Sequence, residues 1–351
     1  MASVDEGHGK TSEILTGTQG SNENGGSRIE IDCGQDIYSV AFLTNGNDIV
    51  GGGKEETIRR WRGEDGNEVG EPMATGSGSG VSNVAVSRDG KWIVSGTTSG
   101  QVMIWNSESH AKENVFGGHD KDVYAVDVSP DATTIATGLE DRTVCVWSFT
   151  GQRLLGPLKH DWAVPAVRFS PDGRLLATAT WGRESVRIYD IHDGRLLADA
   201  PIRVNSPFNQ SLAWLSNSRE IFALSHDRNI HHLDVFAGRT LSKWAIRRNS
   251  RPECIVLASN GAFVAASTGS AVSFWDTTTH DQICSVIRHP ANVWSMAISE
   301  NYDLVLGGER KITLRSLFGV VPSRYMDDHV SVSPSGSRPV RYWSLTNRLV
   351  D

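Results

Sequence analysis

The sequence predicts an all-β fold that repeats one unit seven times along the chain. A short apolar strand ending in a large side chain returns every 40 to 44 residues. Self-similarity with a period of roughly 20–50 residues indicates a repeat architecture. The composition agrees, because the 351 residues include 35 glycines, which suit turns, and 11 tryptophans, which suit short apolar strands.

Each copy contains the same series of short strands and polar turns. The recurring strands end at Trp61, Trp105, Trp147, Tyr189, Leu233, Trp275 and Arg315. Before each end stand two further strands, joined by turns such as Ser170-Pro171-Asp172-Gly173, which is hairpin chemistry. A weaker fourth strand follows, as at residues 153–155. Four short antiparallel strands per unit of roughly 40–45 residues are typical of a propeller blade, so we expect a seven-bladed β-propeller.

Residues 28 to about 318 resemble the WD-repeat family. The third copy carries the clearest motifs, with Gly118-His119, Ser129-Pro130-Asp131 and Thr137-Gly138 in the family's order. The literal Trp-Asp pair occurs once, at residues 275–276. The resemblance implies that residues 28–31, an isolated alternating strand, complete the seventh blade and remove its open edge. The alternative is that residues 339–343 supply this strand.

Three regions are expected. Residues 1–27 are polar and acidic and should be disordered, residues 28–318 should form the propeller, and residues 319–351 should form a flexible tail.

Charge and composition exclude several classes of protein. With 34 Lys and Arg against 41 Asp and Glu, the net charge of −7 makes direct nucleic-acid binding improbable. No apolar run is long enough to span a membrane, and the first residues do not resemble a secretory signal. The four cysteines lack C-x-x-C spacing and are expected to be reduced thiols. We therefore expect a cytoplasmic and/or nuclear protein with no metal and no cofactor.

Four polar residues of the third copy allow two interpretations. His119, Thr137 and Asp141 could form a base, a nucleophile and an orienting carboxylate. The resemblance implies instead that His119, Thr137, Asp141 and Trp147 form the buried hydrogen-bonded tetrad of the family, in which the polar groups satisfy one another. We favour the structural tetrad, because its spacing coincides with the repeat. No other copy shows all four residues, so the remaining blades are expected to depend on packing.

The partner-binding face should be the end of the propeller at which the central channel opens. The loop before the first strand and the turn between the second and third strands emerge there together. Side chains three and five residues past the tetrad-histidine position, and one residue before the tetrad-aspartate position, should surround the mouth. The expected partner-binding residues are Asp36, Tyr38, Lys54, Asp122, Tyr124, Glu140, His226, Asn292 and Trp294, with Trp181 as an uncertain member. Aromatic residues among acids suit a basic peptide; the alternative is that the three aromatics fill the core between blades.

The expected function is a non-enzymatic scaffold for protein–protein interaction within an intracellular complex, since no catalytic constellation is present and the fold alone fixes no function. One alternative is a substrate adaptor of a ubiquitin ligase, although the family's Trp-Asp-x-Arg signature is broken by Thr278. Another is a chromatin- or RNP-associated propeller that reads a basic peptide. An enzyme acting in the channel would need converging carboxylates or histidines on inner strands that instead read Val, Ala, Ser and Ile.

Overall fold

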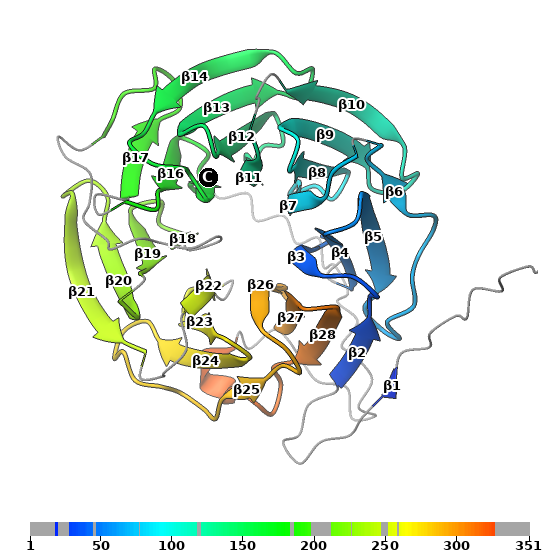
Figure 1. Ribbon diagram of the computed structural model, residues 1–351. Helices are drawn as coiled ribbons and strands as arrows, with labels where there is room; N and C mark the ends of the chain where they lie inside the picture. Colours follow the sequence, from blue (N-terminus) through cyan, green and yellow to red (C-terminus); the bar gives the residue numbers. More distant parts are fainter. Residues whose placement is uncertain are drawn as a thin grey trace, which may run out of the picture.

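The computed structural model describes residues 18–19, 28–44, 47–76, 78–117, 121–182, 186–197, 212–225, 227–246, 252–257 and 260–326. Over these residues the chain forms seven antiparallel sheets arranged as blades around one axis (Figure 1). The predicted all-β, seven-bladed propeller is therefore confirmed. None of the helical structure described is long and apolar enough to cross a membrane.

The first three blades each have four strands in sequence order from the axis outward. Blade 1 comprises β3 (Ile37–Phe42), β4 (Asp48–Gly53), β5 (Thr57–Arg62) and β6 (Met73–Ala74). Blade 2 comprises β7 (Val81–Val86), β8 (Trp92–Thr97), β9 (Gln101–Asn106) and β10 (Lys112–Gly117). Blade 3 comprises β11 (Val123–Val128), β12 (Thr134–Leu139), β13 (Thr143–Ser148) and β14 (Arg153–Lys159).

The later blades follow the same plan, with a reduced outer strand in blades 4 and 6. Blade 4 comprises β15 (Ala166–Phe169), β16 (Leu175–Ala179) and β17 (Val186–Asp190), with a single bridge from Tyr189 to Leu196 in the fourth-strand place. Blade 5 comprises β18 (Leu212–Trp214), β19 (Glu220–Leu224), β20 (Asn229–Asp234) and β21 (Arg239–Ala245). Blade 6 comprises β22 (Pro252–Leu257), β23 (Phe263–Thr268), β24 (Ala271–Asp276) and β25 (Ile287–Arg288). Blade 7 comprises β26 (Val293–Ile298), β27 (Asp303–Gly308) and β28 (Lys311–Ser316).

An N-terminal strand completes blade 7. Strand β2 (Arg28–Asp32) pairs with β28 from Arg28↔Arg315 to Asp32↔Lys311, and its Ile29 and Ile31 are buried. A two-residue strand, β1 (Thr18–Gln19), pairs on the outside of β2. The predicted N-terminal closure is confirmed, and the alternative segment 339–343 lies outside the described residues.

The C-terminal boundary of the fold lies further along the chain than the predicted residue 318. Val321, Tyr325 and Met326 are buried in the cluster that joins blades 6 and 7, and a 3-10 turn, η1 (Ser323–Tyr325), leads to this contact. The boundary was misplaced because the apolar residues of this segment lie outside the repeat period. The predicted disorder of residues 1–17 and 20–27, and the predicted tail over residues 327–351, concern residues that the structure does not describe.

Small residues in the second strands set the distance between blades. A Cβ atom placed on Gly52 would lie 2.5 Å from Cγ1 of Val81 in blade 2, and one on Gly96 would lie 2.6 Å from Cγ1 of Val123 in blade 3. Such contacts are shorter than atomic radii allow, so glycine lets adjacent sheets approach closely. Strand β4, which contains three consecutive glycines, is buried along its whole length.

Side-chain hydrogen bonds from a serine stabilise the hairpin turn between the first and second strands in blades 2 and 3. In blade 3 the hydroxyl of Ser129 donates to Asp131 at 2.6 Å and accepts the backbone N–H of Thr134 at 2.9 Å. The Ser87–Asp89 pair repeats the donor contact at 2.6 Å in blade 2. From these turns the second strand runs back to the end of the propeller at which the first strand began, and the predicted binding residues lie at that end.

Candidate functional site

The loop before each first strand and the turn after each second strand lie at the same end of the ring. Register pairs such as Ile37↔Gly53 and Val123↔Leu139 show this directly. The N–H of Lys54 donates to the carbonyl of Asp36, and the N–H of Glu140 donates to the carbonyl of Asp122, both at 3.0 Å. We call this end of the propeller the mouth face. The expected binding residues of blades 1 and 3 are therefore brought together in pairs.

A β-bulge marks the start of the inner strands β3, β7, β11 and β26, and the ladder of β22 in blade 6 shifts register at its start as well. In blade 1, Ile37 pairs with Gly53 and Ser39 with Gly52, so Tyr38 is an extra residue in the ladder. The same shift makes Ser82, Tyr124 and Trp294 the extra residues of blades 2, 3 and 7. A bulge re-aims the side chain that it carries. Tyr38, Tyr124 and Trp294 are the aromatic residues among those at the bulges, and they are the three aromatics predicted for the mouth face.

The bulge aromatics form ring pairs with neighbouring blades. The ring centroids of Tyr38 and Trp294 are 5.8 Å apart, which joins blades 1 and 7. The centroids of Tyr124 and Trp181 are 5.1 Å apart, which joins blades 3 and 4. Tyr38, Tyr124 and Trp294 are all half-buried, so the structure does not place them as fully buried core residues. Trp181 lies beside Tyr124 and is 44% exposed.

Carboxylates lie near the tyrosine of each ring pair. Burial and the charge of Asp36 raise the pKa of Tyr38, and burial with the charges of Glu140 and Asp122 raises that of Tyr124. The pKa of Asp122 itself is raised, first by burial and then by Glu140, against the opposing charge of Lys121. The phenols therefore stay protonated at neutral pH, and the two acids of blade 3 repel each other.

The remaining predicted residues are only partly placed. Asn292 is exposed and donates from Nδ2 to Oε1 of Glu309 at 2.8 Å, on the mouth face of blade 7. Lys54 is exposed at the corresponding turn of blade 1. His226 lies outside the described residues.

Trp162 was missed by the sequence prediction. It is 56% exposed in the loop before β15, and a Cβ on Gly182 would lie 2.4 Å from its Cδ1, so its indole covers the residue after Trp181. The positional rule selected residues three and five past the histidine, whereas Trp162 is two past His160. A tryptophan directly after His160 and Asp161 was the available signal.

The tetrad of blade 3 is observed in part. The indole Nε1–H of Trp147 donates to the hydroxyl of buried Thr137 at 3.0 Å. Asp141 is exposed and accepts from the N–H and the hydroxyl of Thr143 at 2.9 and 2.6 Å. His119 lies outside the described residues, so the four-residue tetrad remains a prediction. Trp105 makes the matching bond to Ser95 in blade 2 at 3.0 Å.

Blade 4 contains a related network, contrary to the expectation that the other blades depend on packing alone. Nδ1 of His160 lies 3.1 Å from the carbonyl of Leu158, and Nε2 lies 2.9 Å from the hydroxyl of Thr178 and 3.3 Å from that of Tyr189. A carbonyl can only accept, so Nδ1 carries the proton and Nε2 accepts. Burial, reinforced by Arg187, lowers the pKa of His160 to about 4 and keeps the imidazole neutral. The sequence did not predict this network because blade 4 lacks the aspartate of the tetrad.

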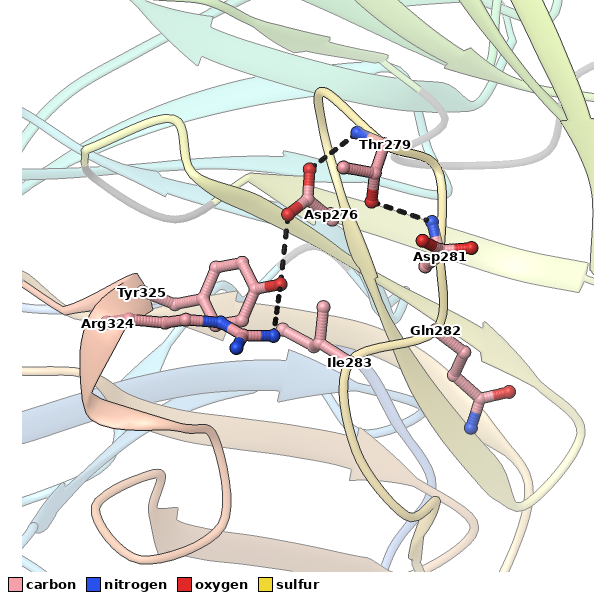
Figure 2. Close-up of a pocket in the computed structure, with 7 residues that line it drawn as sticks. All are labelled: Asp276, Thr279, Asp281, Gln282, Ile283, Arg324 and Tyr325. Carbon is pink, nitrogen blue, oxygen red and sulfur yellow. Dashed lines mark hydrogen bonds between the residues drawn. The ribbon is translucent and has the colours of Figure 1, made fainter.

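A separate pocket of about 370 Å³ lies between blade 6 and η1 (Figure 2). Asp276, from the Trp-Asp pair, accepts the N–H of Thr279 at 2.7 Å through Oδ1 and the hydroxyl of Tyr325 at 2.9 Å through Oδ2. Both oxygens are therefore engaged in holding the fold. Across the described ranges, no group of three or more His, Cys, Asp or Glu side chains is placed to hold a metal ion.

The WD domain, G-beta repeat family model matches residues 70–106, 111–148 and 152–190. Each matched stretch begins at the outer strand of one blade and ends with the third strand of the next. Because each repeat begins with the outer strand of the preceding blade, the last blade has no outer strand of its own. The N-terminal strand β2 fills that place and completes the ring.

Curated relatives carry the same kind of repeat. Over 136 residues the chain is 31% identical to small ribosomal subunit protein RACK1y of Oryza sativa subsp. japonica, which covers 37% of this chain and 40% of that protein. Over 184 residues it is 28% identical to nuclear distribution protein nudF of Emericella nidulans, covering 46% and 41%. Over 247 residues it is 26% identical to transcriptional corepressor LEUNIG_HOMOLOG of Arabidopsis thaliana, covering 68% and 30%. The chain thus matches less than half the length of each relative. The chain therefore contains three WD repeats within a seven-bladed β-propeller.

Proposed function

We propose that this propeller is a non-enzymatic scaffold that binds partner proteins on its mouth face. The observation that carries the proposal is the convergence of bulge aromatics from different blades into half-exposed ring pairs. Tyrosine and tryptophan provide large contact area at little cost in conformational entropy, and they are enriched at binding hot spots. A β-bulge repeated at the same position supplies a structural reason for their outward placement.

The ligand class follows from the charges around the rings. Asp36, Asp122 and Glu140 lie beside the aromatic side chains, whereas Lys54 is the one basic member of the predicted set. A basic peptide or a loop bearing Lys or Arg would lessen the repulsion between Asp122 and Glu140 and complement the negative face. We therefore propose a basic protein segment, rather than a nucleic acid, as the ligand.

A cytoplasmic and/or nuclear location remains part of this proposal. It agrees with relatives named for a ribosomal subunit, nuclear distribution and transcriptional corepression. The ubiquitin-ligase adaptor is less well supported, because Thr278 replaces the arginine of the signature and its N–H is used to cap Asp276 at 2.7 Å.

The test is the triple substitution Tyr38→Ala, Tyr124→Ala and Trp294→Ala, measured by thermal unfolding and by recovery of partners with the full chain. We expect partner recovery to fall at least about tenfold while the melting temperature stays close to that of the parent, because hot-spot aromatics contribute roughly 2 kcal/mol or more each. Phe236→Ala is the matched control, since Phe236 is 57% exposed on a turn at the opposite end of the ring. A collapsed melting temperature, or unchanged recovery, would contradict the proposed binding face.

A further inference from the structure

Blade 4 presents two tryptophans to solvent on the mouth face, away from the Tyr38–Trp294 pair. Trp162 and Trp181 are 56% and 44% exposed and are among the most exposed large apolar side chains of the described chain. Exposed tryptophan is costly in water, and clustered apolar surface of this kind commonly marks an interaction site. Neither residue is needed to fill the core of its blade.

Trp181 pairs with Tyr124, and Trp162 lies beside the residue that follows Trp181. Trp181 contacts Tyr124 at a centroid distance of 5.1 Å with the ring planes tilted by 43°. Trp162 covers Gly182, the residue after Trp181, where any Cβ would lie 2.4 Å from its Cδ1. The rings come from the bulge of β11, the loop before β15 and the turn after β16. We call these three residues the blade 4 aromatic cluster.

The acids next to the cluster are held close together without full neutralisation. The N–H of Glu140 bonds the carbonyl of Asp122 at 3.0 Å, which fixes the two residues side by side. Burial and Glu140 together raise the pKa of Asp122 despite the nearby Lys121. Both acids also act on Tyr124 in the cluster. A cation placed between the carboxylates and the rings would be stabilised by both groups.

The loop that carries Trp162 is fixed before any ligand arrives. Arg187 donates to the carbonyl of Lys159 at 2.9 Å and to Oδ2 of Asp161 at 2.8 Å. His160, between them, is bound to Thr178 at 2.9 Å. A preorganised loop loses little entropy on binding, so more of the contact energy becomes affinity.

We propose that the blade 4 aromatic cluster, with Asp122 and Glu140, binds an arginine side chain of a basic partner segment. Arginine is favoured over lysine because its planar guanidinium stacks on indole and can bond carboxylates through two N–H groups at once. This inference rests on the proposed binding of basic segments at the mouth face, and it assigns their anchoring residue to a site separate from the Tyr38–Trp294 pair.

The experiment measures fluorescence anisotropy of labelled Gly/Ser peptides bearing four spaced arginines, with lysine and citrulline versions of the same peptide. The full chain is compared with the double variants Trp162→Ala/Trp181→Ala and Asp122→Asn/Glu140→Gln. Phe236→Ala is the matched control, because its exposed ring lies at the opposite end of the propeller, and Tyr38→Ala/Trp294→Ala is measured separately to test the other ring pair. Thermal unfolding of each variant reports folding. Trp162→Tyr/Trp181→Tyr is a second variant, which keeps an aromatic ring at both positions.

We expect the arginine peptide to bind several-fold more tightly than the lysine peptide, and the citrulline peptide to bind weakly. Trp162→Ala/Trp181→Ala should weaken arginine-peptide binding about tenfold, which corresponds to the cation–π energies of one to two rings, and tyrosine should restore most of it. Loss of affinity in the acid variant should be smaller at high salt. Equal binding of arginine and lysine peptides, or unchanged binding by the tryptophan variant, overturns the inference. If partner recovery is still lost in Tyr38→Ala/Trp294→Ala, the proposed function stands even when this inference fails.

Discussion

Blades 4 and 7 each have a histidine just before the first strand, and the two imidazoles have different surroundings. His160 in blade 4 contacts the hydroxyls of Thr178 and Tyr189. His289 in blade 7 is equally buried, but its Nε2 has no hydrogen-bond partner within the described part of the chain. The register places Leu306 and Arg315 of blade 7 where blade 4 has Thr178 and Tyr189.

The difference shows that the two blades are stabilised by different interactions. Blade 4 fixes its entry loop by hydrogen bonds between side chains of its own strands. Blade 7 lacks the hydroxyls for this and instead gains a strand from the N-terminus, with five register pairs between β2 and β28. A histidine in this loop is therefore informative only when the second and third strands supply matching partners.

Removing the closing strand should have the largest effect on this pair of blades. We expect deletion of residues 1–32 to lower the free energy of unfolding by about 3–6 kcal/mol, because Ile29 and Ile31 lose their buried sites and β28 becomes an open edge. Chemical denaturation measures the change. Deletion of residues 1–26 is the control, since it leaves β2 in place. Equal stabilities of the two truncations would show that β2 contributes nothing to closure.

The closing strand was predictable from sequence because counting the strands in each repeat was enough to identify it. Residues 28–31 formed a strand without a blade, and the last repeat lacked a fourth strand. The blade 4 network was not predictable in the same way. Blade 4 lacks the aspartate of the tetrad, and only the three-dimensional register shows that the Tyr189 hydroxyl reaches His160.

Some mouth-face residues were likewise predictable from sequence and others were not. Tyr38, Tyr124 and Trp294 follow from the repeat position, and the structure adds that all three are bulge residues. Trp162 does not follow, because its importance comes from lying over Gly182 in space. Position in the repeat thus predicts which strand end a residue occupies, whereas contacts between blades depend on insertions and side-chain directions that spacing does not contain.

Breaking the blade 4 network should have the next largest effect. His160→Ala leaves the hydroxyls of Thr178 and Tyr189 without the imidazole and opens a cavity, so we expect a loss of about 2–4 kcal/mol in the free energy of unfolding. A double-mutant cycle with Thr178→Val isolates the coupling between the two side chains. The network would be refuted by additive effects of the two substitutions.

The pH dependence of stability tests the same histidine with a smaller change. The folded-state pKa of His160 is about 4, against an ordinary value of 6.5. Its contribution is therefore complete above pH 6.5 and is lost as the pH falls from 6.5 toward 4, because the unfolded chain binds the proton first. The loss at pH 4.5 should be about 2–3 kcal/mol.

Other buried histidines, including His231 and His289, also have lowered pKa values. The informative quantity is consequently the difference between the parent protein and His160→Gln, which keeps hydrogen-bonding groups but cannot titrate in this range. Urea unfolding at pH 7.0, 5.5 and 4.5 should give a flatter profile for the variant. Parallel profiles would mean that His160 is protonated equally in the folded and unfolded states.

The smallest effect is expected in blade 7. Nδ1 of His289 lies 2.9 Å from the carbonyl of Ala291, and Nε2 has no hydrogen-bond partner among the described residues. Burial lowers the pKa of this imidazole. Replacing an unsatisfied buried polar group by an apolar one of similar size is close to neutral. We therefore expect His289→Leu to change the free energy of unfolding by less than about 0.5 kcal/mol, and to reduce the loss of stability in acid. Denaturation of His289→Leu beside His160→Leu measures the contrast directly. A cost at His289 as large as that at His160 would mean that this imidazole has a partner beyond the described residues, and the division between the two blades would no longer hold.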